Sequence, residues 1–276
     1  MEPLVFELKS HSGPSFKGDI HLPAGKGTAP VAILCHGFKG FKDWGFFPYL
    51  ADRLAEAGLV AVRMNFSMNG IGADPLALTE TERFADNTIT QELKDLALVC
   101  AAVRHGELPG AARMDRRRLG LLGHSRGAGT GLVRALEDHL IRAVVTWAAV
   151  ETFWGGADPA LWKRQGHLEV LNARTKQVLK VNYRAWEDFQ AHRRAHDFAA
   201  RLPFIRGRAL FVHGREDVSV PPAASERLAR RLGDRGLLHL VKGGDHAFGA
   251  AHPFKGATAA LEDAVRVTRG FLLENL

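Results

Sequence analysis

Short apolar runs and amphipathic stretches alternate along most of this chain. The apolar runs are typical of parallel strands that are buried on both faces of a sheet. They cover residues 31–35, 59–65, 118–123, 141–147, 209–212 and 237–241. The stretches between them carry apolar residues at helical spacing. These cover residues 45–57, 90–104, 126–139, 221–232 and 258–273. The alternation predicts an α/β fold with a mostly parallel, doubly wound sheet.

Two further patterns modify this plan. At the N-terminus, residues 3–9 and 15–22 predict an antiparallel hairpin that leads into the sheet. After residue 150 the alternation stops for about 50 residues, far beyond the usual connection of about 2–6 residues. We therefore predict an inserted cap.

The domain boundaries follow from this interruption. The main α/β domain is expected to comprise residues 1–150 and 201–276, and the cap residues 151–200. Within the cap, 167–172 and 176–181 predict a second hairpin, and 184–201 predicts a helix.

Composition narrows the class of protein. The 276 residues are 46% hydrophobic and 24% charged, which suits one globular domain with an insertion and argues against disorder. No apolar run approaches the roughly 20 residues that span a bilayer, and the charged start has no apolar signal core. We therefore expect a cytoplasmic protein with no membrane partner. Cys35 and Cys100 lie in apolar stretches and are expected to be buried, reduced thiols.

The net charge is the one unusual feature of the composition, because it is strongly positive. Lys and Arg number 37 and Asp and Glu 30, so the chain carries +7. A basic chain suggests nucleic acid, but the arginines are dispersed. Their densest run, 113–119, has no interleaved aromatic residues. We interpret it as a solvated edge and expect no nucleic-acid partner.

A candidate nucleophile lies where the predicted strand 118–123 meets the following helix. The segment Gly123-His-Ser-Arg-Gly127 has the pattern Gly-x-Ser-x-Gly. In a sharp turn the glycines leave room for neighbouring backbone, and the helix dipole favours negative charge developing at Ser125. The alternative is an ordinary Gly/Ser helix cap.

A serine hydroxyl needs a base and an orienting acid. Asp217 follows strand 209–212, and His246 follows strand 237–241. The carboxyl ends of parallel strands collect at one edge of a sheet, so Ser125, Asp217 and His246 are expected to converge there. Taken singly, the last two could be a turn residue and a loop histidine. Two other acidic residues lie nearby. Glu216 could take the place of Asp217 as the orienting acid, and Asp245 is expected to shape the loop that carries His246.

Donors for an oxyanion are expected in the loop His36-Gly-Phe38, after strand 31–35. We assign the oxyanion hole to the backbone N–H groups of Phe38 and Arg126. His36 follows a buried strand directly and is expected to brace the loop. Two further histidines near the site are expected to have supporting or structural roles, His124 and His252.

Together these motifs resemble the α/β-hydrolase superfamily over nearly the whole chain, which implies the α/β-hydrolase fold. Within the superfamily, the sequence from His36 to Lys42 and the insertion with its predicted hairpin resemble those of the dienelactone-hydrolase-like and feruloyl (cinnamoyl) esterase-like serine hydrolases. Two departures matter. Ser125 stands where dienelactone hydrolases proper have cysteine, and the oxyanion loop has one glycine rather than a His-Gly-Gly-Gly run.

Aromatic residues gather in and beside the predicted cap. Trp147, Phe153, Trp154 and Trp186 could form an apolar pocket above Ser125 for an acyl or aromatic group. The alternative is that they pack the cap onto the main domain.

The favoured hypothesis is a serine carboxylesterase acting on small or aromatic-acyl, feruloyl-like esters. It needs no metal and no organic cofactor, and its partner is a small-molecule ester; a homodimer is left open. A serine peptidase or thioesterase could use the same machinery. From another class, a non-catalytic hydrolase-like binding protein is the remaining alternative.

Overall fold

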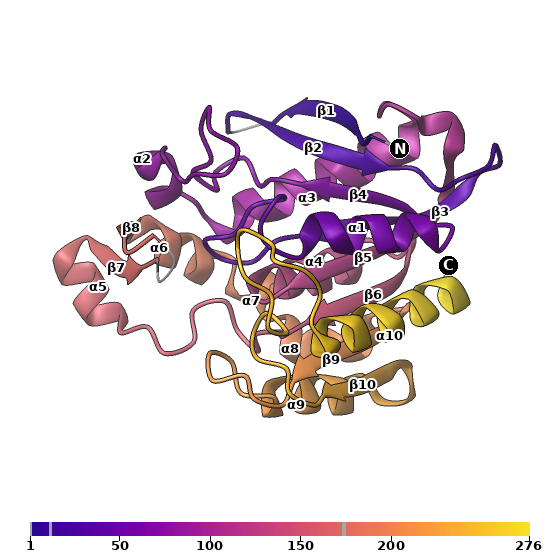
Figure 1. Ribbon diagram of the computed structural model, residues 1–276. Coiled ribbons are helices and arrows are strands. Elements are labelled where there is room, and N and C mark those ends of the chain that lie inside the picture. Colours follow the sequence, from indigo (N-terminus) through magenta and orange to yellow (C-terminus); the bar gives the residue numbers. More distant parts are fainter. Residues whose placement is uncertain (1, 11–12, 173–174) are drawn as a thin grey trace.

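The computed structural model describes residues 2–10, 13–172 and 175–276 (Figure 1). Within these ranges, eight strands form one sheet in the order β1-β2-β4-β3-β5-β6-β9-β10. Their bounds are β1 Leu4–Lys9, β2 Ser15–His21, β3 Ala29–Cys35, β4 Val60–Met64, β5 Met114–His124, β6 Ile141–Trp147, β9 Arg208–Gly214 and β10 Gly236–Val241. β1 and β2 pair antiparallel at one edge, and the strands from β4 to β10 in this order run parallel. The predicted sheet and N-terminal hairpin are confirmed.

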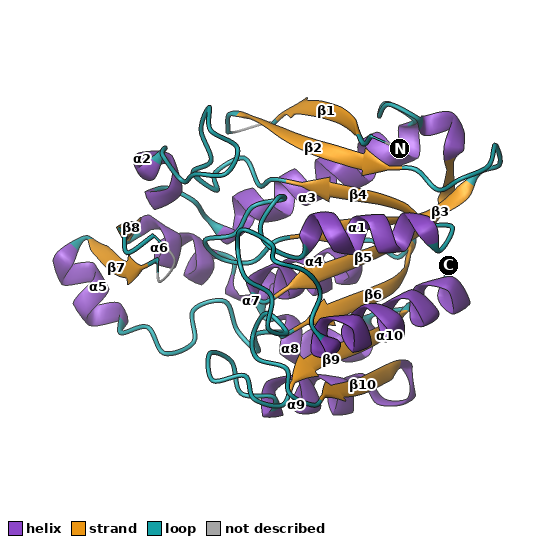
Figure 2. Ribbon diagram, in the orientation of Figure 1, coloured by secondary structure: helices purple, strands orange, loops and turns teal. Residues whose placement is uncertain are grey.

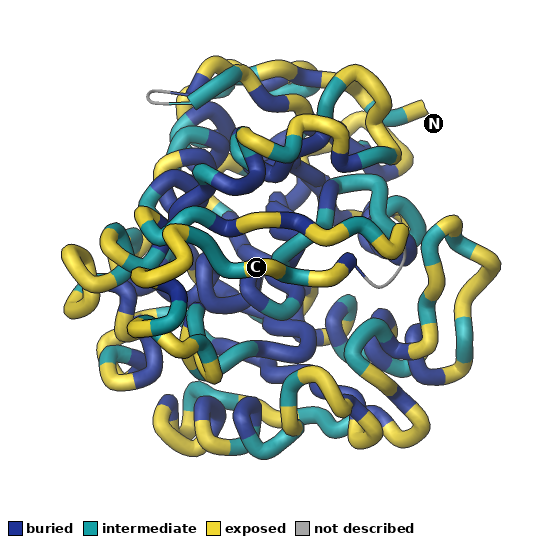
Figure 3. The backbone as a smooth tube through the Cα atoms, turned by 90° about the vertical axis from the view of Figure 1, so that its left-hand side faces the viewer, coloured by how far each residue is buried: buried dark blue, intermediate teal, exposed yellow. Residues whose placement is uncertain are grey.

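Helices cover both faces of the sheet (Figure 2). One face carries α1 Phe47–Glu56 and α10 Ala259–Asn275, and the other carries α3 Ile89–His105, α4 Arg126–Glu137 and α9 Ala223–Leu232. Successive side chains of a strand point to opposite faces. β3 therefore places Ile33 in one core and Leu34 in the other. Figure 3 shows this buried backbone running through the centre of the molecule.

The chain between β6 and β9 is here called the β6–β9 segment (residues 148–207). Its first part, through residue 191, lies beyond the end of the sheet where the parallel strands finish (Figure 1), and residues 198–205 pack with α4 and α9 on one face of the sheet. Its elements are α5 Pro159–Gln165, β7 His167–Leu171, β8 Val178–Asn182, α6 Arg184–Ala191, α7 Arg193–His196, α8 Phe198–Arg201 and the 3₁₀ turn η2 Leu202–Phe204. β7 and β8 form the predicted antiparallel hairpin. Trp162 and Val181 pack there against Phe41 from the loop after β3, which anchors the segment to the main sheet.

Two predicted elements differ in the structure, and the short helices at 81–85 and 159–165 were not predicted. The helix predicted over 184–201 is divided into α6, α7 and α8. Asp197 accounts for the last division, because its carboxylate accepts the backbone N–H of Ala200 and starts α8. β5 begins at Met114 rather than at residue 118, and a register shift against β3 accommodates the exposed Arg116 and Arg117.

Short elements complete the fold. They are α2 Thr81–Ala85 and the 3₁₀ turns η1 Ala111–Arg113 and η3 Gly233–Arg235. Cys35 and Cys100 are buried free thiols, as predicted, and burial raises the pKa of Cys100 to about 12. Among the helices in the described ranges, none is long and apolar enough to cross a membrane.

Candidate active site

Ser125 occupies a strained turn between β5 and α4. Its backbone has φ 55° and ψ −119°, a conformation that a residue with a side chain rarely adopts, and its N–H donates to the Trp147 carbonyl at 2.8 Å. The flanking glycines are required by space. A Cβ at Gly123 would lie 2.2 Å from the Gly127 oxygen, and one at Gly127 would lie 2.4 Å from the His36 oxygen. The turn therefore holds the serine at the N-terminus of α4.

Asp217 and His246 meet at the carboxyl ends of β9 and β10. The Nδ1 of His246 donates to Asp217 Oδ2 at 2.7 Å, which leaves Nε2 as the nitrogen that can face a nucleophile. The other oxygen, Oδ1, accepts the backbone N–H groups of Ser219 and Val220 at 2.8 and 2.9 Å. The Asp217 side chain is fully buried, whereas His246 is 27% exposed. An ionised acid thus orients a histidine that solvent or substrate can reach.

A second histidine, His213, holds the same carboxylate. Its Nε2 lies 3.0 Å from Asp217 Oδ2 and 2.9 Å from the Val220 carbonyl oxygen. Both neighbours are acceptors, so the proton is assigned to Nε2, and the Ser225 hydroxyl donates to Nδ1 at 2.7 Å. Burial would raise the pKa of Asp217, but hydrogen bonds from His213, His246 and the Val220 N–H outweigh it and hold that pKa well below its usual range.

His124, inside the serine turn, supports the loop that carries His246. Its Nε2 donates to the His246 carbonyl oxygen at 2.8 Å, and the two ring centroids lie 4.9 Å apart. Burial, followed by the neighbouring His246, lowers the pKa of His124 to about 3, so the ring is neutral at pH 7. A neutral ring can donate this hydrogen bond without placing a second positive charge beside His246.

The two other acids near the histidine make different contacts. Glu216 is exposed. Asp245 accepts the backbone N–H groups of Ala247 and Gly249 at 2.9 and 2.7 Å and so shapes its own loop. Of the three candidate acids, the structure brings Asp217 to His246.

The loop after β3 is held against the serine turn. His36 donates from Nδ1 to the Gly37 oxygen at 2.9 Å and accepts the backbone N–H of Phe66 at Nε2. Burial lowers the pKa of His36 to about 4, so it stays neutral at pH 7. A Cβ at Gly37 would lie 3.0 Å from the Ser125 Cβ. This close approach places Phe38 beside Ser125 in the lining of one cavity.

Arg126, the residue after the serine, is anchored through its side chain. The buried guanidinium donates to Glu92 Oε1 of α3 at 2.5 Å and lies 4.2 Å from the centroid of the Phe38 ring. Thr130 of α4 also donates to Glu92. Because Glu92 ties the first turn of α4 to α3, the backbone of Arg126 is fixed beside Ser125.

A cavity of about 500 Å³ lies over the serine. Phe38, Ser125 and Arg126 form its floor, and the β6–β9 segment contributes most of its walls. These wall residues are Val150, Phe153, Trp154, Gly155, Gly156, Ala157, Asp158, Leu161 and Leu168. The walls are mostly apolar, and within the described residues no group of potential metal ligands lies in this cavity.

Two of the four aromatic residues predicted for the pocket lie elsewhere. Phe153 and Trp154 line the cavity. Trp147 is a correction: it is fully buried beneath the other face of the sheet, where its indole N–H donates to Thr268. Trp186 lines a neighbouring cavity of about 530 Å³, which shares the Trp154 wall.

Two contacts around the candidate site were not predicted from the sequence: that of His213 with Asp217 and that of Glu92 with Arg126. A weak signal exists for each. His213 ends a buried strand four residues before Asp217, and Glu92 lies four residues before Leu96 on the apolar side of its helix. A charged residue at such a position requires a buried partner.

Comparisons with known proteins place this geometry in a known fold. The chain matches no protein-family model and no curated protein sequence. Among solved structures, it is similar to Est1E from Butyrivibrio proteoclasticus with ferulic acid bound, at 18% identity and TM-score 0.72 over 98% of both chains.

Two further structures are similar. The α/β hydrolase GrgF from Penicillium sp. sh18 has 18% identity and TM-score 0.69, covering 100% of this chain and 99% of GrgF. A Mycobacterium tuberculosis puromycin-hydrolyzing peptidase has 16% identity and TM-score 0.67, covering 100% of this chain and 39% of the peptidase. At these identities the likeness concerns the fold, and this chain has the α/β-hydrolase fold.

Proposed function

We propose that the protein is a serine hydrolase that cleaves carboxylic esters of small molecules. The observation that carries this proposal is the 2.7 Å hydrogen bond between buried Asp217 and partly exposed His246, at the same edge of the sheet as Ser125 in its strained turn. A buried acid, an oriented histidine and a serine at a helix N-terminus are the parts that nucleophilic acyl transfer requires.

The proposed reaction proceeds in two halves. His246 Nε2 takes the proton of Ser125 Oγ as that oxygen attacks the ester carbonyl carbon, and Asp217 stabilises the resulting imidazolium. The backbone N–H groups of Phe38 and Arg126 hold the oxyanion of the tetrahedral intermediate. When the intermediate collapses, the C–O bond to the alcohol breaks and His246 protonates the departing oxygen.

Water completes the cycle. His246 accepts a proton from the water as it attacks the acyl-enzyme, and returns a proton to Ser125 as the carboxylic acid leaves. Every proton in both halves passes through His246, so these steps need neither a metal nor an organic cofactor.

The cavity supports small or aromatic acyl groups as substrates. Its walls of Phe153, Trp154, Leu161 and Leu168 offer apolar and aromatic surface to an acyl chain, with Phe38 at the base. The structurally similar Est1E has been solved with ferulic acid bound. We assign residues 151–200 as a cap that closes over the acyl group, and hydroxycinnamoyl esters as the first substrates to test.

An amide-cleaving variant of this chemistry is the second candidate, because a puromycin-hydrolyzing peptidase has a similar fold. The same serine, histidine and acid would serve, with His246 protonating an amine instead of an alcohol. Turnover of aminoacyl anilides at rates comparable to those for esters would favour it, and turnover of acyl-CoA would favour a thioesterase.

The test combines active-site labelling with a substrate panel. Wild-type protein is expected to react with a fluorophosphonate and to hydrolyse p-nitrophenyl acetate and hydroxycinnamoyl esters, and Ser125→Ala to lose both activities. Ser15→Ala, at an exposed position on β2, is the matched control. Full ester turnover by Ser125→Ala contradicts the proposal, and a folded wild type that is inert to probe and panel favours a non-catalytic binding protein.

A further inference from the structure

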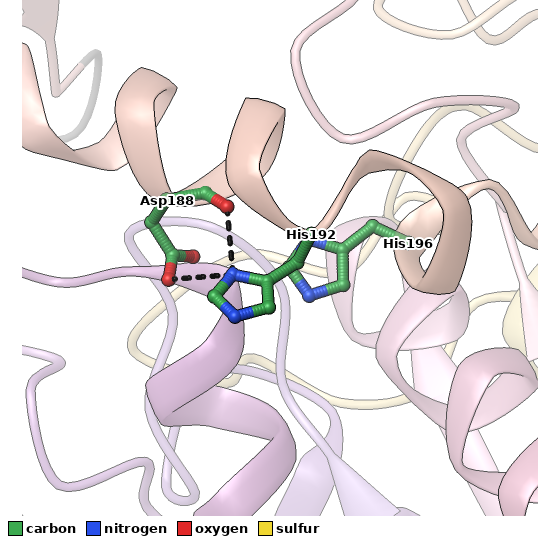
Figure 4. Close-up of side chains that lie close together, drawn as sticks. All are labelled: Asp188, His192 and His196. Carbon is green, nitrogen blue, oxygen red and sulfur yellow. Dashed lines mark hydrogen bonds and ion pairs between the residues drawn. The ribbon is translucent and has the colours of Figure 1, made fainter.

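Three potential metal ligands converge on the β6–β9 segment, away from the serine. Asp188 lies on α6, His192 between α6 and α7, and His196 at the end of α7 (Figure 4). Their spacing of four residues brings them to one side of the helical path. One candidate donor atom from each residue lies within 4.8 Å of the other two. Among the described residues, this is the group of three or more His, Cys, Asp or Glu side chains that are close enough to share a metal ion.

One of the three separations matches that of two ligands on a shared ion. His192 Nδ1 lies 3.4 Å from Asp188 Oδ1. Two ligand atoms at about 2.0–2.2 Å from a tetrahedral ion are about 3.3–3.6 Å apart. His192 Nδ1 also donates to the backbone carbonyl oxygen of Asp188 at 2.9 Å (Figure 4), and an ion that binds at this nitrogen displaces that proton. Thr90 Oγ1 lies 3.3 Å from His192 Nδ1 and 3.5 Å from His196 Nε2, so both rings present a nitrogen to the same small space.

The three side chains differ in how far they are exposed to solvent. His196 is 3% exposed, the Asp188 side chain 15% and the His192 side chain 49%. The other ring nitrogen of His196, Nδ1, is buried without a hydrogen-bond partner in the described part of the chain. An ion can therefore reach the three side chains from the exposed His192 side.

We propose that Asp188, His192 and His196 bind one divalent transition-metal ion of the Zn²⁺ class. Two imidazoles and a carboxylate are the ligand set that Zn²⁺ and its first-row neighbours prefer, and a water fills the fourth position. The adjacent Arg193 and Arg194 are exposed, and Arg193 lines the same cavity as His196; their positive charges oppose cation binding and are offset by the Asp188 carboxylate.

The ion acts as a clamp between the β6–β9 segment and α3. Asp188 Oδ2 already accepts the backbone N–H of Thr90 at 3.1 Å, in the first turn of α3. Two residues further along the same helix, Glu92 holds the guanidinium of Arg126 beside Ser125. Metal binding holds Asp188 in the orientation that accepts the Thr90 N–H, and so stabilises the contact between the segment and α3; it takes no part in the chemistry at Ser125.

The first experiment measures the metal itself, without substrate. Chelator-treated wild-type protein is titrated with Co²⁺ and then with Zn²⁺. We expect one equivalent of Co²⁺ to give the intense visible absorption of a four-coordinate site, Zn²⁺ to displace it, and saturating Zn²⁺ to raise the melting temperature. Absence of stoichiometric binding overturns the proposal, whatever the outcome of the esterase test.

Variants locate the site. His192→Ala removes a half-exposed ligand and is expected to weaken Zn²⁺ binding at least about tenfold and to abolish the rise in melting temperature. Asp188→Asn provides an independent second variant. His105→Ala, at the exposed end of α3, is the control and should bind like wild type. Unchanged Zn²⁺ affinity in both site variants contradicts the assignment.

Hydrogen exchange tests the clamp. Zn²⁺ should slow amide exchange in α6, α7 and the first turn of α3 in the wild type, and not in His192→Ala. Protection confined to α6 and α7 would overturn the bridging role.

Discussion

The substitution Asp217→Asn tests the proposed acid most sharply, because its four hydrogen bonds cannot all survive. Oδ2 accepts N–H donors from His246 and His213, and Oδ1 accepts two backbone N–H groups. If the NH₂ of the introduced asparagine faces the imidazoles, His246 must accept at Nδ1 and carry its proton on Nε2, where it cannot act as a base. If the amide is flipped, its NH₂ meets the backbone donors of Ser219 and Val220.

Either orientation removes the negative charge that stabilises the imidazolium. We expect kcat to fall by about 10³- to 10⁴-fold, which corresponds to about 4–5.5 kcal/mol of lost transition-state stabilisation. The assay is steady-state hydrolysis of p-nitrophenyl acetate, with circular dichroism to establish that the variant is folded. Glu216→Gln, at the exposed neighbouring acid, is the control and should stay within about twofold of wild type. A folded Asp217→Asn that keeps a tenth or more of wild-type kcat refutes the reasoning.

Three further outcomes concern stability. Gly127→Ala should lower the melting temperature, and it should reduce the free energy of unfolding by about 1–3 kcal/mol or more, because the added Cβ would lie 2.4 Å from the His36 backbone oxygen. Gly131→Ala in the same helix, whose nearest Cβ contact is 3.9 Å, should be neutral or stabilising by up to about 1 kcal/mol, and an equal loss in both would contradict the steric argument. Glu92→Gln should cost about 3–5 kcal/mol in urea unfolding, since it leaves the buried Arg126 cation without its counter-charge, and a loss below about 1 kcal/mol would argue against this ion pair. The folded-state pKa of Asp217 is depressed, so its contribution to stability is present above an unfolded-state pKa of about 4 and is lost as the pH falls toward the folded value. The stability gap between wild type and Asp217→Asn should therefore narrow on acidification below about pH 4, and a gap that widens would reverse the assigned sign.

Local chemistry predicted the main elements of the fold and the strand ends at which Asp217 and His246 lie. The apolar runs identified the parallel strands because both faces of this sheet are covered, and such strands need no polar alternation. The Gly-x-Ser-x-Gly pattern located the strained turn, because glycine is the residue type that fits where backbones approach within about 3 Å. The acid and the histidine were located because parallel strands end at one edge.

Two features could not be predicted from the pattern of apolar and polar residues along the chain. Trp147 belongs to a strand that is apolar on both faces, so periodicity could not tell toward which side of the sheet its side chain points. The structure places the Trp147 side chain in the core away from Ser125. The helix predicted over 184–201 is divided because Asp197 caps a new helix, a local hydrogen bond that competes with helical continuation.

The sequence by itself determined the element order, the strained serine turn and the strand ends at which Asp217 and His246 lie, because these depend on local periodicity and on residue size. Tertiary structure alone showed that Asp217 and not Glu216 contacts the histidine, as expected, and it revealed that His213 shares this acid and that Glu92 anchors Arg126. It also decided that Asp188, His192 and His196 face Thr90. These contacts join residues through sheet pairing and helix packing, and such pairings depend on the three-dimensional register of the elements, which no single segment encodes.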